Sequence, residues 1–112
     1  MRSVSKISLG AGAEWQRSLL PFLLMKEMAK SPGHGYGLAQ RLANAGFYKV
    51  AGAKLYPALN RLESDGLCCA TWEGGEGGPG RKVYRLTELG RQALAEQSRA
   101  WSELVDRIAA LG

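Results

Sequence analysis

The residues with the clearest chemistry lie in the second half of the chain and suit nucleic acid rather than catalysis. A segment with helical spacing carries Lys54, Asn60 and Arg61, and a basic hairpin follows with Arg81 and Lys82. Asparagine can bond an adenine edge, whereas lysine and arginine can reach guanine or phosphate. A helix followed by a basic two-stranded hairpin can enter a DNA major groove while the hairpin contacts the backbone. The pattern is typical of a winged helix-turn-helix and favours a transcription regulator over an enzyme.

The helix that would enter the groove is predicted over residues 51–65. Leu55, Leu59 and Leu62 recur at i, i+4 and i+7 and form its buried stripe. At about 100° per residue, the opposite side of the helix points outward, with Tyr56 on one shoulder and the basic residues on the other. We expect this surface to contact DNA through Ala53, Lys54, Tyr56, Pro57, Asn60 and Arg61.

The hairpin is predicted from two short strands, LCCATWE and RKVYRL, joined by the glycine-rich tip GGEGGPG. Arg81 and Lys82 follow the tip and can reach phosphates, which position a protein without specifying sequence. Tyr36, at the start of a helix predicted over residues 36–45, can also touch a phosphate. The alternatives are an ordinary solvated helix face and a hairpin with incidental charge.

Other chemistries lack the residues that they need. The glycine run is not followed by GK[ST] or by a helix, so it is not a nucleotide-binding loop. His34 is the only histidine and has no nucleophile nearby, and no metal site is expected. Cys68 and Cys69 are adjacent in a predicted strand, so one should be buried and the other exposed. A redox switch at these cysteines is the less favoured alternative to a structural role.

The composition fits one small soluble domain with a polyanionic partner. The chain has 112 residues, 46% of them hydrophobic and 22% charged, with a net charge of +5 and a pI near 9.5. Between Arg17 and Arg61 the only acid is Glu27. A domain this small often gains stability by pairing with a second copy. We expect a cytoplasmic protein, because no signal peptide is evident and the run LLPFLLM is too short for a bilayer.

The chain divides into three parts. Residues 1–13 are rich in Ser, Gly and Ala and are predicted to be a flexible arm. Residues 14–87 should form the winged helix-turn-helix, which opens with a largely buried helix from about Glu14 to Ala29. Pro21 should kink or restart that helix. FYKV should form a brief extended segment, and residues 88–112 should form a dimerisation helix.

The last helix combines an N-cap with an apolar stripe. Thr87 is the expected N-cap of a helix over residues 88–110. Apolar residues then recur at spacings of three or four, with charges on the other side. We expect the dimer interface to contain Leu94, Trp101, Leu104, Val105, Ile108 and Leu111.

Three motifs resemble those of the PadR family of transcriptional regulators. They are GHGYGLAQRL, KLYPALNRLESDGL and GGPGRKVYRLTELGRQAL, in that order, and the resemblance runs from Leu20 to the C-terminus. The short length resembles the subfamily with a single C-terminal helix. Two positions depart from the family pattern: Lys54 replaces a small hydroxyl residue, and Ala51 replaces a frequent serine N-cap.

The resemblance implies a homodimer that binds a pseudo-palindromic operator, usually as a repressor released by a small molecule. It also implies that two symmetry-related Trp101 rings, with Trp15 and Val105 nearby, can flank a planar aromatic effector. The equal alternative is that Trp101 fills the dimer core. The competing function is a winged-helix protein–protein adaptor that does not bind DNA, and no cofactor is expected for either.

Overall fold

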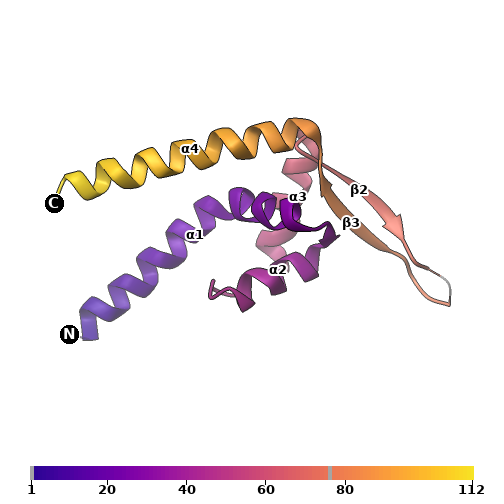
Figure 1. Ribbon diagram of the computed structural model, residues 1–112. Coiled ribbons are helices and arrows are strands. Elements are labelled where there is room, and N and C mark those ends of the chain that lie inside the picture. The colour runs from indigo at the N-terminus through magenta and orange to yellow at the C-terminus, as the bar shows by residue number, and fades with distance from the viewer. Residues whose placement is uncertain (1, 76) are drawn as a thin grey trace.

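The computed structural model describes residues 2–75 and 77–112, with side chains from residue 12 onward. Figure 1 shows a mostly helical molecule with a small sheet, which confirms the predicted fold class. α1 and α4 extend to the same side of the molecule, and the hairpin projects to the other. The elements of the described chain are α1 (Arg2–Lys30), β1 (Gly33–His34), α2 (Gly35–Asn44), α3 (Gly52–Ser64), β2 (Cys68–Glu73), β3 (Arg81–Leu86) and α4 (Glu88–Ala110).

The first helix is longer than the sequence predicted. α1 begins at Arg2, whereas we expected a flexible arm over residues 1–13 and a helix start near Glu14. Gly12 lies against the loop before α3, where an added Cβ would be 3.0 Å from the Tyr48 hydroxyl oxygen. A tertiary contact of this kind can outweigh the poor helix propensity of glycine, which is about 1 kcal/mol.

α1 also continues through Pro21, so the restart that we considered is not observed. Proline cannot donate to the carbonyl of Arg17, and a proline inside a helix costs about 3 kcal/mol. Burial of the neighbouring side chains offsets this cost, since Leu20 and Leu24 are 5% and 0% exposed. Each fully buried leucine contributes roughly 1.5–3 kcal/mol.

The core lies where α1, α2 and α3 meet. Leu55, Leu59 and Leu62 of α3 are all buried, as their spacing predicted. Side chains from α1, α2 and the two hairpin strands complete the cluster, which holds the outward face of α3 in a fixed orientation. The largest fully buried side chains are Leu24, Met25, Leu38, Leu42, Leu55 and Leu59.

The sheet is antiparallel, with strand order β1-β3-β2. The hairpin was predicted, but β1 was not: Gly33 pairs with Tyr84 and His34 with Val83. A two-residue strand is too short to leave a periodic signal in the sequence. Residues 47–50, the FYKV segment, pair with no strand of the described sheet and lie in the loop before α3.

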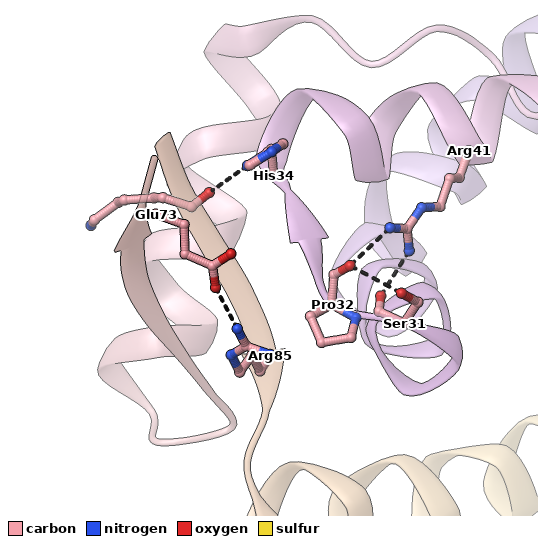
Figure 2. A network of polar contacts seen from close by, with 7 residues as sticks. Ser31, Pro32, His34, Arg41, Glu73 and Arg85 are labelled. Carbon is pink, nitrogen blue, oxygen red and sulfur yellow. Dashed lines mark hydrogen bonds and ion pairs between the residues drawn. The ribbon is translucent and has the colours of Figure 1, made fainter. Parts of the chain in front are cut away.

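Arg41 joins the end of α1 to the start of β1 (Figure 2). Its guanidinium donates to the carbonyl oxygens of Ser31 at 2.8 Å and Pro32 at 2.9 Å. Both residues follow the last residue of α1, so their carbonyls accept no bond from within that helix, and the Arg41 side chain supplies donors for them. Arg41 therefore supports the chain's own backbone and is not part of a free basic surface.

α4 starts as predicted. The Thr87 hydroxyl accepts from the Gly90 N–H at 3.0 Å and donates to the Gly66 carbonyl at 2.6 Å. The first bond is the N-cap, and the second fixes the cap to the turn before β2. No helix in the described part of the chain has a stretch both long and apolar enough to span a bilayer.

Candidate nucleic-acid interface

The outer face of α3 is open to solvent. Ala53, Lys54, Pro57, Asn60 and Arg61 are all exposed, opposite the buried leucine stripe. Pro57 lies inside the helix without ending it. The face therefore presents one amide and two cations on a rigid helix, which is a suitable arrangement for contacts with base edges.

A cleft of about 670 Å³ separates one shoulder of α3 from the hairpin. We call it the wing-side cleft. Five residues predicted to bind DNA line it, from α2, α3 and β3, which are separate in the sequence. They are Tyr36, Tyr56, Asn60, Arg81 and Lys82.

The basic residues of the hairpin differ in how far their charges are neutralised. Arg85 bonds to the Glu73 carboxylate across the two strands (Figure 2). Lys82 is half-buried, with its Nζ 3.7 Å from the Glu63 carboxylate. Arg81 is exposed and has no acidic partner among the described residues. Arg81 is therefore the hairpin cation most available to an external anion.

Two other residues of the wing-side cleft have contrasting surroundings. Trp72 is 70% exposed, because the hairpin projects beyond the core at this point. His34 has its Nδ1 3.4 Å from the Lys82 carbonyl oxygen (Figure 2). This contact connects β1 to β3, in keeping with a structural histidine.

The opposite shoulder of α3 borders a smaller cleft of about 170 Å³. Lys54 lies there with Arg17 of α1 and Lys49 of the loop before α3. Arg61, about two turns further along α3 than Lys54, has its Nε 4.0 Å from the Asp65 carboxylate. The sequence did not single out Arg17 and Lys49, because helical spacing does not reveal which segment lies beside α3.

The predicted dimer residues separate into two groups. Leu94 is half-buried and packs against the chain's own core. The others are exposed: Trp101 by 42%, and Leu104, Val105, Ile108 and Leu111 by 41–87%. The second half of α4 therefore leaves an apolar stripe uncovered within a single chain.

Between α1 and α4 lie two further clefts of about 390 and 370 Å³. Trp101, Leu19 and Phe22 line both. Of the three residues predicted to bind a ligand, Trp101 borders these clefts, whereas Trp15 and Val105 line neither. Trp15 is 68% exposed.

The two cysteines lie on opposite faces of β2, as predicted. Cys68 is buried and Cys69 is exposed. Burial, reinforced by the nearby Glu63 carboxylate, raises the pKa of the Cys68 thiol to about 11. This thiol is therefore protonated and unreactive near neutral pH. Within the described residues, no three His, Cys, Asp or Glu side chains are grouped so that they could hold a metal ion.

Comparison with known proteins identifies the family. The sequence profile described as "Transcriptional regulator PadR-like family" matches residues 24–96. The chain belongs to this family. Transcriptional regulator Rv3488 of Mycobacterium tuberculosis (strain ATCC 25618 / H37Rv) is 39% identical over 95 residues, covering 85% of this chain and 87% of that protein.

Solved structures of the family have the same fold. The crystal structure of a PadR family transcriptional regulator from Eggerthella lenta DSM 2243 matches with a TM-score of 0.87 and 32% identity, covering 99% of this chain and 96% of that one. A PadR-like transcription factor from Bacteroides fragilis ("bacteroid fragilis") matches with a TM-score of 0.78 and 29% identity, covering 92% and 99%. The resemblance and the winged-helix prediction are thereby confirmed, and the family consists of transcriptional regulators, which are not enzymes.

Proposed function

We propose that this PadR-like regulator is a homodimeric repressor that binds a pseudo-palindromic operator in the cytoplasm. The observation that carries the proposal is the wing-side cleft, where an exposed helix face lies beside Arg81, a cation with no acidic partner among the residues that the structure describes. α3 enters the major groove in this proposal, and the cleft receives the sugar-phosphate backbone beside it.

The proposed contacts follow from the side chains that line this surface. Asn60 bonds a base edge, and Lys54 or Arg61 reaches a guanine or a phosphate. Arg81, Lys82 and the Tyr36 hydroxyl hold the backbone. Lys82 exchanges the Glu63 carboxylate for a phosphate, at little cost because this ion pair is half-exposed and long.

The uncovered stripe of α4 supports the homodimer. From Trp101 to Leu111 it extends about 15 Å along the helix at 1.5 Å per residue. A contiguous exposed apolar surface of this kind is typical of an interaction site. Two-fold symmetry would then present two α3 helices to half-sites about 34 Å apart, one turn of DNA.

The effector is the finer part of the proposal. Trp101 and Phe22 border apolar clefts large enough for a small planar aromatic molecule. Such a molecule would release the operator only if it bound better to a dimer whose α3 helices have a different spacing. If Trp101 instead fills the dimer core, no aromatic effector binds there.

The test of DNA binding uses Arg81→Ala, with Arg85→Ala as the matched control. The probe is a duplex of roughly 30 base pairs that the wild-type protein selects from a random library. Losing one phosphate contact per subunit should lower the slope of log affinity against log salt by about 1.8 per dimer. Arg85→Ala should change the slope less, because Glu73 already neutralises that cation. Equal slopes for wild type and Arg81→Ala would remove the hairpin from the interface.

The contacts of α3 need a separate measurement. Asn60→Ala should weaken the free energy of operator binding by about 1–3 kcal/mol and relax base preference at one position of each half-site. Lys54→Ala or Arg61→Ala should weaken binding without loss of fold. If the wild-type protein selects no duplex even at low salt, the protein–protein adaptor is the better interpretation.

Trp101→Ala tests the α4 stripe and the effector together. The variant should dissociate at higher concentration than the wild type in sedimentation equilibrium. It should also lose binding of planar aromatic compounds, measured by calorimetry so that the readout does not depend on Trp101 itself. Binding of these compounds that persists without Trp101 would contradict the pocket.

A further inference from the structure

α3 has basic neighbours on the shoulder that faces away from the hairpin. Arg17, Lys49 and Lys54 line one cleft there, from α1, the loop before α3, and α3 itself. Tyr56 and Asn60 line the wing-side cleft instead. At about 100° per residue, Lys54 and Tyr56 point to opposite sides of the outward face. We call Arg17, Lys49 and Lys54 the α1-side cluster.

No acidic group in the described part of the chain neutralises this cluster. All three side chains are exposed, and none is within 4.0 Å of a carboxylate there. Other cations of this protein, such as Lys30 and Arg85, do have such partners. Three like charges around one small cleft repel one another, so a polyanion is the complementary partner.

The cluster is also held in shape by a specific contact. Gln16 Nε2 donates to the Tyr48 carbonyl oxygen at 2.9 Å, and the Tyr48 N–H donates to Gln16 Oε1 at 2.8 Å. The close approach of Gly12 to the Tyr48 ring strengthens this contact. The loop that carries Lys49 is therefore fixed to α1, one residue away from Arg17 in sequence. A loop whose backbone is ordered before binding loses less conformational entropy when it binds.

A helix in the major groove has one phosphate backbone on each side, because the groove is only about 12 Å wide. The wing-side cleft can contact the backbone of one strand. We propose that the α1-side cluster binds phosphates of the other strand, so that each subunit grips both backbones of its half-site. This inference rests on the proposed entry of α3 into the groove and adds Arg17 and Lys49 to the interface.

The first test is the salt dependence of the double variant Arg17→Gln/Lys49→Gln on the selected duplex. Two lost contacts per subunit should lower the salt slope by about 3.6 per dimer. The control is Arg91→Gln/Arg99→Gln, which removes the same net charge from exposed positions of α4. If the control variant lowers the salt slope by the same amount, the change reflects net charge alone, and the proposal is overturned.

The second test resolves the two strands by hydroxyl-radical footprinting. The double variant should lose protection on one strand of each half-site, and Arg81→Ala should lose it on the other. If the double variant keeps the wild-type footprint and slope while Arg81→Ala loses both, the α1-side cluster is not in the interface, although the proposed function stands. If the wild-type protein binds no duplex, both proposals fail.

Gln16→Ala separates positioning from charge. It keeps every cation but removes both bonds to Tyr48. Affinity should fall while the salt slope stays near the wild-type value, since the number of phosphate contacts is unchanged. Unaltered affinity would mean that the bonds of Gln16 do not position the cluster.

Discussion

Replacing Gly90 with alanine should destabilise the protein, although alanine is the better helix former. Gly90 lies in the first turn of α4 and is buried. A Cβ there would be 2.0 Å from the Leu67 carbonyl oxygen and 2.9 Å from Cδ2 of Leu86. The Leu67 carbonyl cannot move away freely, because it accepts the Thr87 N–H at 3.1 Å. The added methyl group therefore meets fixed backbone.

The magnitude follows from two opposing effects. Alanine in place of glycine stabilises a helix interior by about 1 kcal/mol. Overpacking a filled site typically costs about 1–3 kcal/mol and occasionally more. The contact at Gly90 lies roughly 1 Å inside the closest distance that real Cβ atoms reach, and its partner is backbone, so the cost should lie at the upper end. We expect the free energy of unfolding to fall by about 2 kcal/mol or more.

Urea unfolding measures this change at a fixed protein concentration, because the stability of the proposed dimer would depend on concentration. Gly37→Ala in α2 is the matched control, because no atom lies within 4 Å of its added Cβ. That variant should be more stable than the wild type by about 0.5 kcal/mol. If the urea midpoint of Gly90→Ala is equal to or above that of the wild type, the steric argument is refuted.

Four other predictions concern the helix ends and the thiols. Ala51 is the N-cap of α3 in extended conformation without a side-chain bond, so Ala51→Ser should raise the free energy of unfolding in urea by about 1 kcal/mol. Thr87→Ala should lower it by about 1–2 kcal/mol, whereas Thr87→Ser should retain most of the stability. At about pH 8, a thiol reagent should label one cysteine of the folded chain, Cys69, and a second only in denaturant. Folding raises the pKa of Cys68 from 9.0 to about 11, so the thiol ionises first in the unfolded chain as pH rises. The free energy of unfolding should therefore decline between these two pH values. The decline should be smaller in Cys68→Ala than in the wild type.

Strong local signals predicted much of the fold. The leucine stripe located α3, the glycine tip located the hairpin, and Thr87 located the start of α4. Each of these elements is decided by residues close together in the sequence. The predicted start of α1 was wrong, because the helix continues through Gly12. A contact with Tyr48 there can compensate for the poor helix propensity of glycine. β1 was missed because its pairing with β3 joins segments about 50 residues apart, which no local pattern reveals.

The candidate site shows the same division. The sequence predicted which face of α3 is exposed, and Asn60 and Arg61 lie there. It did not predict that Glu73 neutralises Arg85 while no acid of residues 2–75 or 77–112 pairs with Arg81, because both arginines look alike in a hairpin sequence. Nor did it associate Arg17 with the loop before α3, since that neighbourhood depends on how α1 packs against the other helices. Whether the predicted residues bind DNA remains a prediction.

α1 connects the two surfaces on which regulation would depend. On one side it carries Arg17 and Gln16, which face the loop before α3. On another it carries Leu19 and Phe22, which line the clefts against α4 beside Trp101. If an effector binds at α4 and the α1-side cluster grips DNA, a shift of α1 changes both contacts through one rigid helix. The coupling then requires two positions of α1, one favoured by the ligand and the other by DNA. Each partner can shift the equilibrium between these positions only by the difference in its affinity for the two. Gln16→Ala should accordingly weaken the effect of an aromatic compound on operator affinity more than it weakens binding of that compound itself.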